Sequence, residues 1–481
     1  MIFRRSPSPA PHTPIPTFFM PSSSAKATLT QGPIAPMLIR LTIPMVFGIF
    51  SMVAFNLVDT YFIGQEGTLE LAALSFTLPV VMVLGAIGMG MSMGASAVIS
   101  RAFGEGDQAK VQRLTVDSLM LALAAALLFV GLGLLTMDPL FRLLGAEGEV
   151  LELVKEYMTV WYIGVSFVII PFVGNSAIRA NGDTLTPAVI MASMVVLNII
   201  LDPILIFGWG PIPAMSLRGA AIATVIARAL SLLLGLVVLY RKDMLTLRVP
   251  STAEALTSWR SILRIGLPAS ATNLVVPLTT ALITRLVATY GPEAVAALGV
   301  SSRIDLFAIM IVVALSSVIG PFVGQNLGAG KLQRLQKGVM MSQRFGLLWG
   351  VAMLLLLGLS GRWIAPLFTD NTQVMEYIVL YLMIVPFGYM ARCVYALGNT
   401  ILNVLDKPLL ASSITLVQMF AIYLPMAYLG SMWLGLPGIF GALATAYTAG
   451  GAASYLLVRR ELRQRIQKQK TPPASLEAVP A

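Results

Sequence analysis

The sequence predicts an all-α integral membrane protein whose twelve transmembrane helices form two six-helix bundles related by a parallel pseudo-twofold repeat. Three observations predict this fold. First, 57% of the 481 residues are hydrophobic and only 11% are charged, whereas soluble domains carry about 25% charged residues. Second, long apolar stretches recur along the chain, with the charged residues gathered between them. Third, the two halves of the sequence match each other at a nearly fixed offset.

Apolar stretches of membrane-spanning length, about 20 residues each, follow one another through the chain. The expected spans are 38–63, 71–98, 115–136, 149–178, 184–208, 218–240, 262–289, 294–323, 338–360, 373–402, 408–430 and 436–458. The preceding segment 1–33 is rich in Pro and Ser and lacks an apolar run of signal-peptide length. We therefore expect it to be a disordered cytoplasmic tail.

The distribution of basic residues predicts the orientation of the spans. Of the 32 Lys and Arg residues, 24 lie in or beside the N-terminal tail, the even-numbered connections and the C-terminal tail, and three lie in the odd-numbered connections. By the positive-inside rule, we expect both termini to be cytoplasmic. The membrane that we expect is a bacterial inner membrane. The basic tail 459–481 then faces the anionic inner leaflet. The net charge of +10 thus needs no nucleic acid as partner.

The internal repeat divides the chain into two bundles. A shift of 224 residues superposes Pro44 on Pro268, Ala72-Ala73-Leu74 on Ala296-Ala297-Leu298, Gly104 on Gly328 and Gly106 on Gly330. Because each half has an even number of spans, both halves enter the membrane from the same side. The predicted domains are an N-terminal bundle (34–240), a cytoplasmic linker (241–261) and a C-terminal bundle (262–458).

Residue usage excludes most enzyme chemistry. One cysteine (Cys393) and one histidine (His12) make neither a disulfide framework nor a Cys/His zinc site. The segment 324–332 (GQNLGAGKL) lacks two residues of the phosphate-loop pattern. The glycines of 85–94 lie inside an apolar span and predict close helix packing, not dinucleotide binding. We expect no enzyme, no structural metal and no cofactor.

Three aspartates lie within the expected spans: Asp59, Asp202 and Asp305. An aspartate near the centre of a transmembrane helix costs about 2.5–3.5 kcal/mol on insertion scales, so each is a functional hypothesis. Asp59 lies near the outer end of the first span and Asp202 toward the outer end of the fifth. Both belong to the N-terminal bundle.

Helix geometry predicts that polar residues of four helices meet near these acids. At about 1.5 Å per residue, Asp59, Asp202, Thr224 and Tyr157 lie within roughly 6 Å of one depth in the membrane. Asn198 lies one turn from Asp202 on the same helix face. The sequence therefore predicts a polar pocket in the outer half of the N-terminal bundle.

The oxygen atoms of this pocket suit a small hard cation or protons. Pro203 lacks an N–H and leaves the carbonyl of Ile199 without its helical partner, which adds one more oxygen. An all-oxygen set is typical of Na⁺ sites in transporters, and the same carboxylates also hold protons. The candidate Na⁺ ligands are Asp59, Asn198, Asp202 and Thr224. The alternative is that each acid makes a helix-packing hydrogen bond inside the bundle, without a transport role.

The C-terminal bundle does not repeat this chemistry. The positions that match the two acids under the repeat are Ile283 and Tyr423. Asp305 is a secondary candidate, because Arg303, Arg285 and Arg392 lie in the same half, and we favour a structural ion pair over a coupling role. Methionines in the spans would suit a promiscuous drug surface, but ordinary packing is the preferred interpretation.

The motifs of this chain resemble those of the multidrug and toxic compound extrusion (MATE) transporters, over about residues 36–460. The motifs are IPMVFGIFSMVAFNLVDTYFIGQ in the first span, SRAFGEGD after the second, NGDTLTP before the fifth and LNIILDP within it. The resemblance implies a V-shaped pair of bundles that works by alternating access. It also implies export of amphipathic, often cationic compounds in exchange for inward H⁺ or Na⁺, by a protein that we expect to be a monomer.

The acids resemble those of the DinF-like branch of that family. In this branch the cation site matches Asp59, Asn198, Asp202 and Thr224, with Tyr157 in the same network. Another branch carries acids in helices 7 and 8 or 10, but here span 7 has none and span 10 has only Glu376 near its start. Asn175 matches a family polar position. It lies roughly 27 Å from Tyr157 along a straight helix, so it is a secondary candidate outside the cation site.

Two other functions remain open at this stage. A flippase for lipid-linked oligosaccharides, of the same superfamily, would prefer a cationic central groove, to which Arg285 and Arg303 would contribute. An intramembrane hydrolase would need two acids close together on facing helices. The expected function is a cation-coupled antiporter that acts on amphipathic small molecules within the lipid bilayer.

Overall fold

The computed structural model of the chain describes residues 27–246, 248 and 251–470. Apart from one bridge between Trp209 and Ile212, the described secondary structure is helical. The elements are η1 (Thr28–Thr30), α1 (Ile34–Glu66), α2 (Thr68–Glu105), α3 (Gln108–Leu143), α4 (Gly148–Ile163), α5 (Ser166–Ala180), α6 (Leu185–Ile206), α7 (Ser216–Arg241), α8 (Thr252–Val287), η2 (Ala288–Tyr290), α9 (Pro292–Gly328), α10 (Leu332–Ile364), η3 (Ala365–Leu367), α11 (Thr372–Ile384), η4 (Val385–Gly388), α12 (Tyr389–Val404), α13 (Pro408–Leu416), the π-helix η5 (Val417–Tyr423), α14 (Leu424–Leu434) and α15 (Leu436–Lys470).

These elements make twelve membrane-length segments. Among the described residues, ten helical segments are long and apolar enough to cross a membrane, and the bent pair of α4 and α5 makes an eleventh. The helix α15 is the twelfth, with 35 residues. Its second half carries the basic residues 459–470, which lower its mean hydropathy. The predicted all-α fold with twelve membrane-length segments is confirmed.

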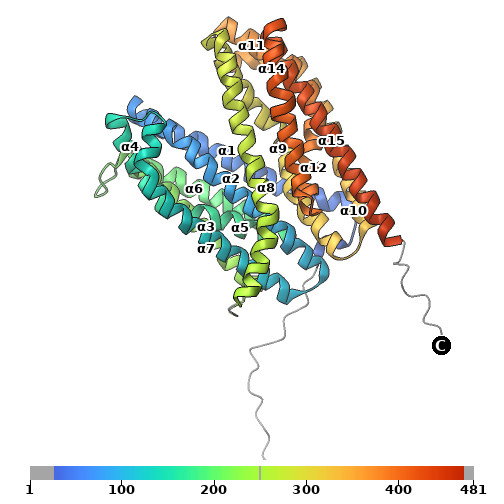
Figure 1. Cartoon of the computed structure of the whole chain (residues 1–481). Coiled ribbons are helices and arrows are strands. Elements are labelled where there is room, and N and C mark those ends of the chain that lie inside the picture. Colours follow the sequence, from blue (N-terminus) through green and yellow to red (C-terminus); the bar gives the residue numbers. More distant parts are fainter. Residues whose placement is uncertain (1–26, 247, 249–250, 471–481) are drawn as a thin grey trace, which may run out of the picture.

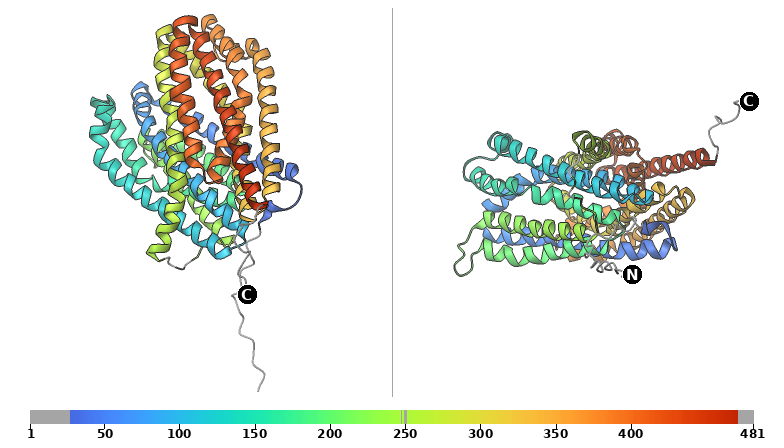
Figure 2. Two further views of the ribbon diagram at one scale, coloured as in Figure 1. Left: turned by 45° about the vertical axis from the view of Figure 1, so that its right-hand side comes forward. Right: turned by 90° about the horizontal axis from the view of Figure 1, so that it is seen from below.

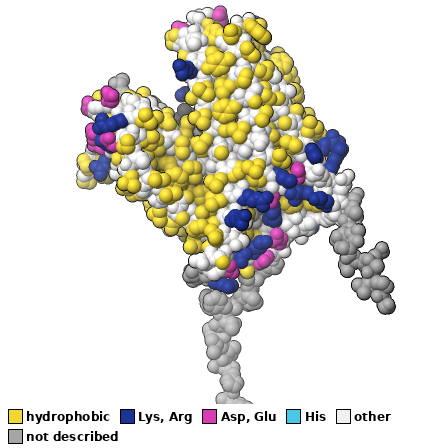
Figure 3. Space-filling view, viewed as in Figure 1, with side chains coloured by type: hydrophobic (Ala, Val, Ile, Leu, Met, Phe, Trp, Pro, Cys, Tyr) yellow, Lys and Arg dark blue, Asp and Glu magenta, His cyan; other side chains and the backbone are white. Residues whose placement is uncertain are grey.

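The molecule consists of two halves, α1–α7 and α8–α15, which meet at one end and separate toward the other (Figures 1 and 2). We name these the closed end and the open end. Figure 3 shows the indentation between the two lobes at the open end. Gln469 donates a hydrogen bond to the carbonyl of Gly330 (3.1 Å) and Lys331 to that of Thr30 (3.0 Å), so both described chain ends lie at the closed end.

At the closed end, α2 and α9 cross with almost no space between their backbones. A Cβ atom on Gly104 would lie 2.1 Å from the carbonyl oxygen of Gln325, and one on Gly328 would lie 2.1 Å from that of Arg101. Gly104 and Gly328 are equivalent under the 224-residue repeat, and so are Arg101 and Gln325. Small residues allow such contact between membrane helices. The two equivalent helices therefore cross at the pseudo-twofold axis.

A second close crossing joins α2 to α8, the first helix of the other half. A Cβ atom on Gly90 would lie 2.5 Å from the carbonyl oxygen of Gly266, and one on Gly94 would lie 2.4 Å from that of Ile262. The glycines of 85–94 thus serve helix packing, as their sequence context predicts. The helix α2 contacts both α8 and α9 and forms much of the junction between the halves.

Two of the sequence motifs end and begin helices. In SRAFGEGD, Gly106 has φ of +77°, a left-handed conformation that ends α2. The side chain of Asp107 then accepts a hydrogen bond from the backbone N–H of Lys110 (2.9 Å) and begins α3. The same motif thus provides the closed-end crossing, a helix end and a helix start.

In NGDTLTP, Asp183 stabilises the start of α6. Its carboxylate accepts hydrogen bonds from the N–H (3.0 Å) and hydroxyl (2.5 Å) of Thr186 and forms an ion pair with Lys242 (2.9 Å). Burial alone would raise the pKa of Asp183. The Thr186 hydrogen bonds and the Lys242 ammonium lower it by more than burial raises it, so the pKa lies below its usual value. This loop carboxylate is therefore ionised at neutral pH and has a structural role.

The chain before α1 is bound to the closed end of the molecule. We name residues 28–32 the strap. Leu29 is buried, and its N–H donates to Gln325 Oε1 (2.9 Å), while Arg334 donates to the carbonyls of Gln31 and Gly32 (2.7 Å each). The expectation of a disordered segment 1–33 is therefore wrong for residues 28–32, because their backbone groups are hydrogen bonded. Residues 1–26 lie outside the described residues.

The other predicted connections are more helical than expected. The helix α8 begins at Thr252, inside the predicted linker 241–261, where Ser251 and Glu254 form a capping box. The helix α15 runs through residues 459–470 of the predicted C-terminal tail, and residues 471–481 lie outside the described part. Transmembrane helices here continue beyond their apolar stretches because their capping residues lie in the polar connections.

Candidate functional site: a carboxylate cluster beside a central cavity

The two acids predicted from the first and fifth spans lie close to each other in the structure. Asp59 lies on α1 and Asp202 on α6, two helices that pack together. Asp202 and Asn198 are 0% exposed, and Asn198 Nδ2 donates a hydrogen bond to Asp202 Oδ1 (2.9 Å). The charge of Asp59 acts on Asp202 and on the buried Tyr157 of α4. We name Asp59, Asp202, Asn198 and Tyr157 the carboxylate cluster.

The cluster contains acceptor oxygens without hydrogen-bond partners. These atoms are Asp59 Oδ1, Asp202 Oδ2 and Asn198 Oδ1, and all three are buried. A buried acceptor without a partner costs about 1–3 kcal/mol, and more when it is charged. Three such oxygens in one cluster are therefore a place where a proton or a small cation would be stabilised.

One helical turn toward the closed end, a second layer lies against the cluster. Phe55 lies one turn before Asp59 on α1, and Trp161 lies one turn after Tyr157 on α4. The guanidinium carbon of Arg228, on α7, lies 5.9 Å from the ring centroid of Phe55 and 5.9 Å from that of Trp161. These distances are typical of cation–π contacts. An arginine thus lies between two aromatic rings beside the carboxylates.

Thr224 and Asn175, the other polar residues predicted in the N-terminal half, lie on α7 and α5. Thr224 is buried on α7, one turn from Arg228 on the side of the cluster. Asn175 lies on α5, where it lines the central cavity and its Oδ1 atom is buried without a hydrogen-bond partner. The helix α6 passes through Pro203 without a break, so no unwound segment forms there.

Asp305 belongs to a separate, well-satisfied group in the C-terminal half. Its carboxylate forms an ion pair with Arg392 (2.8 Å) and accepts hydrogen bonds from Tyr381 (2.9 Å) and Tyr389. The guanidinium of Arg392 also lies over the ring of Tyr447, 4.7 Å from its centroid. Arg285 and Arg303 are exposed and do not contact this group. This is the geometry of the structural ion pair that the sequence favours.

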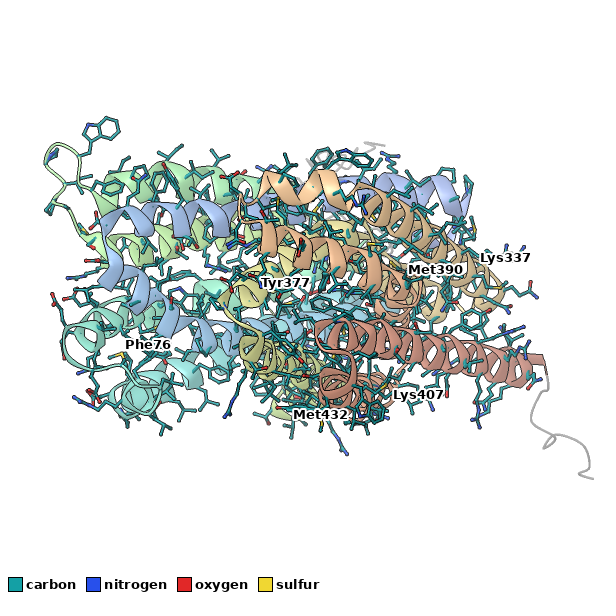
Figure 4. The ribbon with its side chains drawn as sticks, turned by 90° about the horizontal axis from the view of Figure 1, so that it is seen from above. Phe76, Lys337, Tyr377, Met390, Lys407 and Met432 are labelled. Carbon is teal, nitrogen blue, oxygen red and sulfur yellow. The ribbon has the colours of Figure 1, made fainter. Side chains whose placement is uncertain are left out.

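A cavity of about 340 Å³ lies between the two halves. Arg228 lines it, and the cavity continues from Arg228 toward the closed end. It is lined by α1, α2, α5, α6 and α7 of the first half and by α9 and α12 of the second. The lining residues are Met45, Ile49, Met52, Met89, Ser92, Met93, Ser96, Phe167, Val168, Pro171, Phe172, Asn175, Arg179, Met191, Met194, Arg228, Ser231, Val313, Ser316, Ser317, Gly320, Pro321, Thr400 and Val404. In the view from above, Phe76 of α2 and Lys337 of α10 lie on opposite sides of the molecule, with the helices of the two halves between them (Figure 4).

The lining is adaptable and mostly apolar. Six methionines, two phenylalanines and five serines are among these residues. Methionine repacks around different shapes, and scattered hydroxyls accept several hydrogen-bond patterns. Of the methionines considered from sequence, Met89 and Met93 line the cavity, whereas Met91 is buried in the core and Met82 is exposed. Methionines of one helix therefore line the cavity, pack in the core or lie on the exposed surface.

The charged side chains of the lining are both basic. Arg228 is shared with the carboxylate cluster, because the charge of Asp59 acts on it. Arg179 lies in the last turn of α5, near the closed end, and forms no ion pair or hydrogen bond with the part of the chain that the structure describes. No acidic residue is among the described lining residues. An intramembrane arginine is rare, and this was the sequence signal for Arg228, whereas Arg179 follows directly after the expected span 149–178.

The arrangement defines a class of protein. Two pseudo-symmetric six-helix halves around a central cavity, with buried acids beside it, are the architecture of a secondary transporter. The model of the MatE family matches residues 44–204 and 268–429, one segment in each half, and the two segments begin at the 224-residue offset of the repeat. The chain belongs to the MatE family of multi-pass membrane transporters, which are not enzymes.

Individual relatives agree with this assignment. An FAD transporter of Shewanella oneidensis is 35% identical over 433 residues, which cover 90% of this chain and 96% of that protein. The multidrug export protein MepA of Staphylococcus aureus is 27% identical over 432 residues, or 89% of this chain and 94% of MepA. The crystal structure of the Vibrio cholerae MATE transporter VcmN in the bent form has a TM-score of 0.85 and 32% identity, and the match covers 90% of this chain and 98% of VcmN.

Proposed function

We propose that this transporter exports amphipathic small molecules from a bacterial cell in exchange for inward H⁺ or Na⁺, with its closed end toward the cytoplasm. One observation carries the proposal: the partnerless carboxylate oxygens of Asp59 and Asp202 lie beside the layer that lines the central cavity. One chain contains the cluster, the cavity and both halves, so a monomer would suffice for transport.

The donor set of the cluster fits either coupling ion. Na⁺ would take the free oxygens of Asp59, Asp202 and Asn198 as ligands, because hard cations prefer oxygen. A proton would convert one carboxylate oxygen into a donor and remove a buried negative charge. Thr224 is the remaining candidate ligand on α7. The ion would neutralise the cluster, and the residues of this chain would hold it at a fixed depth.

Export after carboxylate neutralisation tests the coupling role. In proteoliposomes with imposed pH and Na⁺ gradients, applied separately, Asp59→Asn and Asp202→Asn should each lower gradient-driven export of an amphipathic dye at least tenfold. The gradient that drives the wild-type protein identifies the ion. Asp138→Asn is the matched control, because Asp138 lies in the same half in an exposed ion pair with Arg142 (2.7 Å). Wild-type export by both cluster variants would contradict the proposal.

The charge of the cavity supports a second candidate substrate class. Both charged lining residues, Arg179 and Arg228, are basic, and the relative from Shewanella oneidensis is an FAD transporter. Export of an anionic flavin nucleotide is therefore the alternative to export of cationic drugs. Transport of FAD but not of riboflavin or ethidium would favour it. Transport of a lipid-linked sugar diphosphate, without export of either flavin, would instead indicate a flippase.

A further inference from the structure

A second cavity, of about 420 Å³, lies between α1 of the first half and α9 and α10 of the second. We name it the lateral groove. It is lined by seven residues of α1 between Ala35 and Phe47, by two residues of α9 and by three of α10. It shares no lining residue with the central cavity, which α1 borders through Met45, Ile49 and Met52. The lateral groove is therefore a separate site on another face of α1.

The lateral groove lies in the half of the membrane at the closed end. Ala35 is the second residue of α1, directly after the strap, and Arg334 of α10 donates to strap carbonyls, so both helices begin at the closed end. From Ala35 to Phe47, α1 rises about 18 Å. One leaflet of a hydrocarbon core about 30 Å thick measures roughly 15 Å. The groove is thus about as long as one leaflet, the depth over which a lipid acyl chain extends.

The groove offers an apolar surface to the lipid. Ten of its twelve lining residues are apolar. Ile39, Ile43 and Phe47 are 60%, 52% and 68% exposed on a helix of membrane-spanning length, so this side of α1 faces lipid tails. A chain of methylene groups would therefore match most of the lining.

Two hydroxyl groups complete the lining. The Thr42 hydroxyl donates to the carbonyl of Leu38 (2.7 Å). Ser342 of α10 is only 2% exposed, and its Oγ atom has no hydrogen-bond partner among the described residues. A hydroxyl is both a donor and an acceptor. The groove thus contains one free donor, which can reach an oxygen of a bound molecule.

Three basic residues flank the groove. On α10, Lys337 lies one turn before the lining residue Met341 and Arg344 lies three residues after it, so all three share a helix face. On α1, Arg40 shares a face with the lining residue Ile43. The three bases are exposed and form no ion pair or hydrogen bond with the described residues. Figure 4 shows Lys337 at the outer rim of the molecule.

The helices that line the groove provide no acid to compensate these charges. Residues 34–58 of α1, 306–328 of α9 and 332–364 of α10 contain neither Asp nor Glu, and nor does the strap. Arg344 lies about 9 Å inside the expected span 338–360. A base that faces lipid at this depth is costly, and its long side chain reaches toward the interface. The negative group that this position offers is the phosphate of a lipid headgroup.

We propose that the lateral groove is a binding site for one anionic phospholipid of the leaflet at the closed end. An acyl chain fills the apolar groove, and the headgroup phosphate lies between Lys337 and Arg344 on one side and Arg40 on the other. Because α1 belongs to one half and α9 and α10 to the other, the bound lipid contacts both halves. It therefore stabilises the contact between the halves at the closed end.

Photo-crosslinking of the full chain in nanodiscs tests the site. The probes are phosphatidylglycerol and phosphatidylcholine with the same diazirine-labelled acyl chain, each as a minor component of phosphatidylcholine nanodiscs. Mass spectrometry measures labelling of the groove segments 35–47 and 341–345. The phosphatidylglycerol probe should label them about tenfold more, because no choline offsets its phosphate charge. Excess unlabelled phosphatidylglycerol should remove this labelling. Residues 352–360 of α10, toward the open end, are the reference and should be labelled equally by both probes.

Charge variants separate headgroup recognition from apolar contact. Lys337→Gln combined with Arg344→Gln should lower groove labelling by the phosphatidylglycerol probe about fivefold and leave that by the phosphatidylcholine probe within about twofold. Lys337→Arg combined with Arg344→Lys keeps both charges and should keep the preference. Arg362→Gln, on the same helix at the open end, is the matched control and should change neither. Ile43→Trp narrows the groove and should lower labelling by the phosphatidylglycerol probe.

Four results would overturn the site. They are equal labelling of the groove by both probes, a preference that survives in the double Gln variant, an equally strong preference at residues 352–360, and labelling that excess phosphatidylglycerol does not displace. A groove that neither probe labels, in a chain that forms dimers in nanodiscs, would instead indicate a contact between two copies. None of these measurements depends on transport.

Discussion

Arg179 is the charge in the cavity that no described residue compensates. It lies in the last turn of α5, where the negative end of the helix dipole stabilises a cation. Its side chain donates no hydrogen bond to another described residue. An anion in the cavity would therefore gain its most favourable contact at this side chain, near the closed end. Arg179 and Arg228 differ in this respect, since Asp59 acts on Arg228.

Neutralising Arg179 should change the charge preference of the cavity. Arg179→Gln is expected to weaken binding of tetraphenylborate about tenfold, which is about 1.4 kcal/mol, and to strengthen binding of tetraphenylphosphonium, because one positive charge leaves a weakly screened site. Equilibrium binding measures both affinities. Arg142→Gln is the control, since Arg142 is exposed in α3. Unchanged affinities for both probes would show that bound molecules do not reach Arg179.

At the scale of residues, the sequence predicted the acids better than the bases. Asp59, Asp202 and Asn198 could be placed together because acids are rare in membrane helices and a helix has a fixed rise per residue. Arg228 carried the same kind of signal, because it lies within the expected span 218–240, whereas Arg179 follows directly after the span 149–178. The role of the two arginines depends on which helices pack against α7 and α5. The periodicity of one helix shows which face a residue occupies, but it does not show which helix packs against that face.

Among the helices, the fourth span shows what apolarity alone misses. The sequence predicts one straight span over 149–178, whereas the structure has α4 and α5 bent by 43° at a break after Ile163. At the break, Gly164 approaches Val225 so closely that a Cβ atom would lie 2.3 Å from its side chain. Asn175 thereby turns into the cavity. The equivalent segment of the second half is interrupted by η4, so the repeat preserves the break.

The crossing of α2 and α9 leads to a prediction about the closed end. Gly104→Ala and Gly328→Ala should each destabilise the protein by about 1–3 kcal/mol, because the new methyl group meets backbone atoms that cannot rotate away. Thermal unfolding in detergent measures the loss. Gly299→Ala is the matched control, since Gly299 lies in α9 with open space around its Cβ position. Equal stability of all three variants would contradict the close crossing.

For the whole molecule, the sequence predicted twelve spans and their division into halves. These features follow from hydrophobicity and from the internal offset. The end at which the halves meet was not predictable, because periodicity carries no information on the state of a transporter. The strap was not predictable either, since its bonds to Gln325 and Arg334 are made by backbone groups of residues 29–32.

The strap connects both halves at the closed end. Leu29 donates to Gln325 of α9, and Gln325 in turn donates to the carbonyl of Ala180 at the end of α5 (2.8 Å). Thr28 donates to the carbonyl of Asn181 (3.0 Å). Opening of the closed end requires the two halves to separate here, so these hydrogen bonds stabilise the state that the structure shows.

Removing the Gln325 bridge should open the closed end more often. Gln325→Leu is expected to raise thiol labelling of an Asn181→Cys probe several-fold, in a Cys393→Ser background, because two bridging hydrogen bonds are lost. Labelling rates in membrane vesicles measure this. Gln112→Leu is the control, since among the described residues the Gln112 side chain donates to Asp243, which belongs to the same half. Labelling that stays at the wild-type rate would show that the strap does not hold the halves together.

The paired glycines of the closed end also bear on the origin of the chain. Gly104 contacts the helix that carries Gly328, and the reverse holds, although the two positions are copies of one another. A single half that associated with an identical half would bring this one glycine against the backbone of the residue three positions before it in the other copy. The crossing would then have needed only one substitution to arise. In the present chain each glycine meets the backbone of the other helix, so the close crossing depends on both positions.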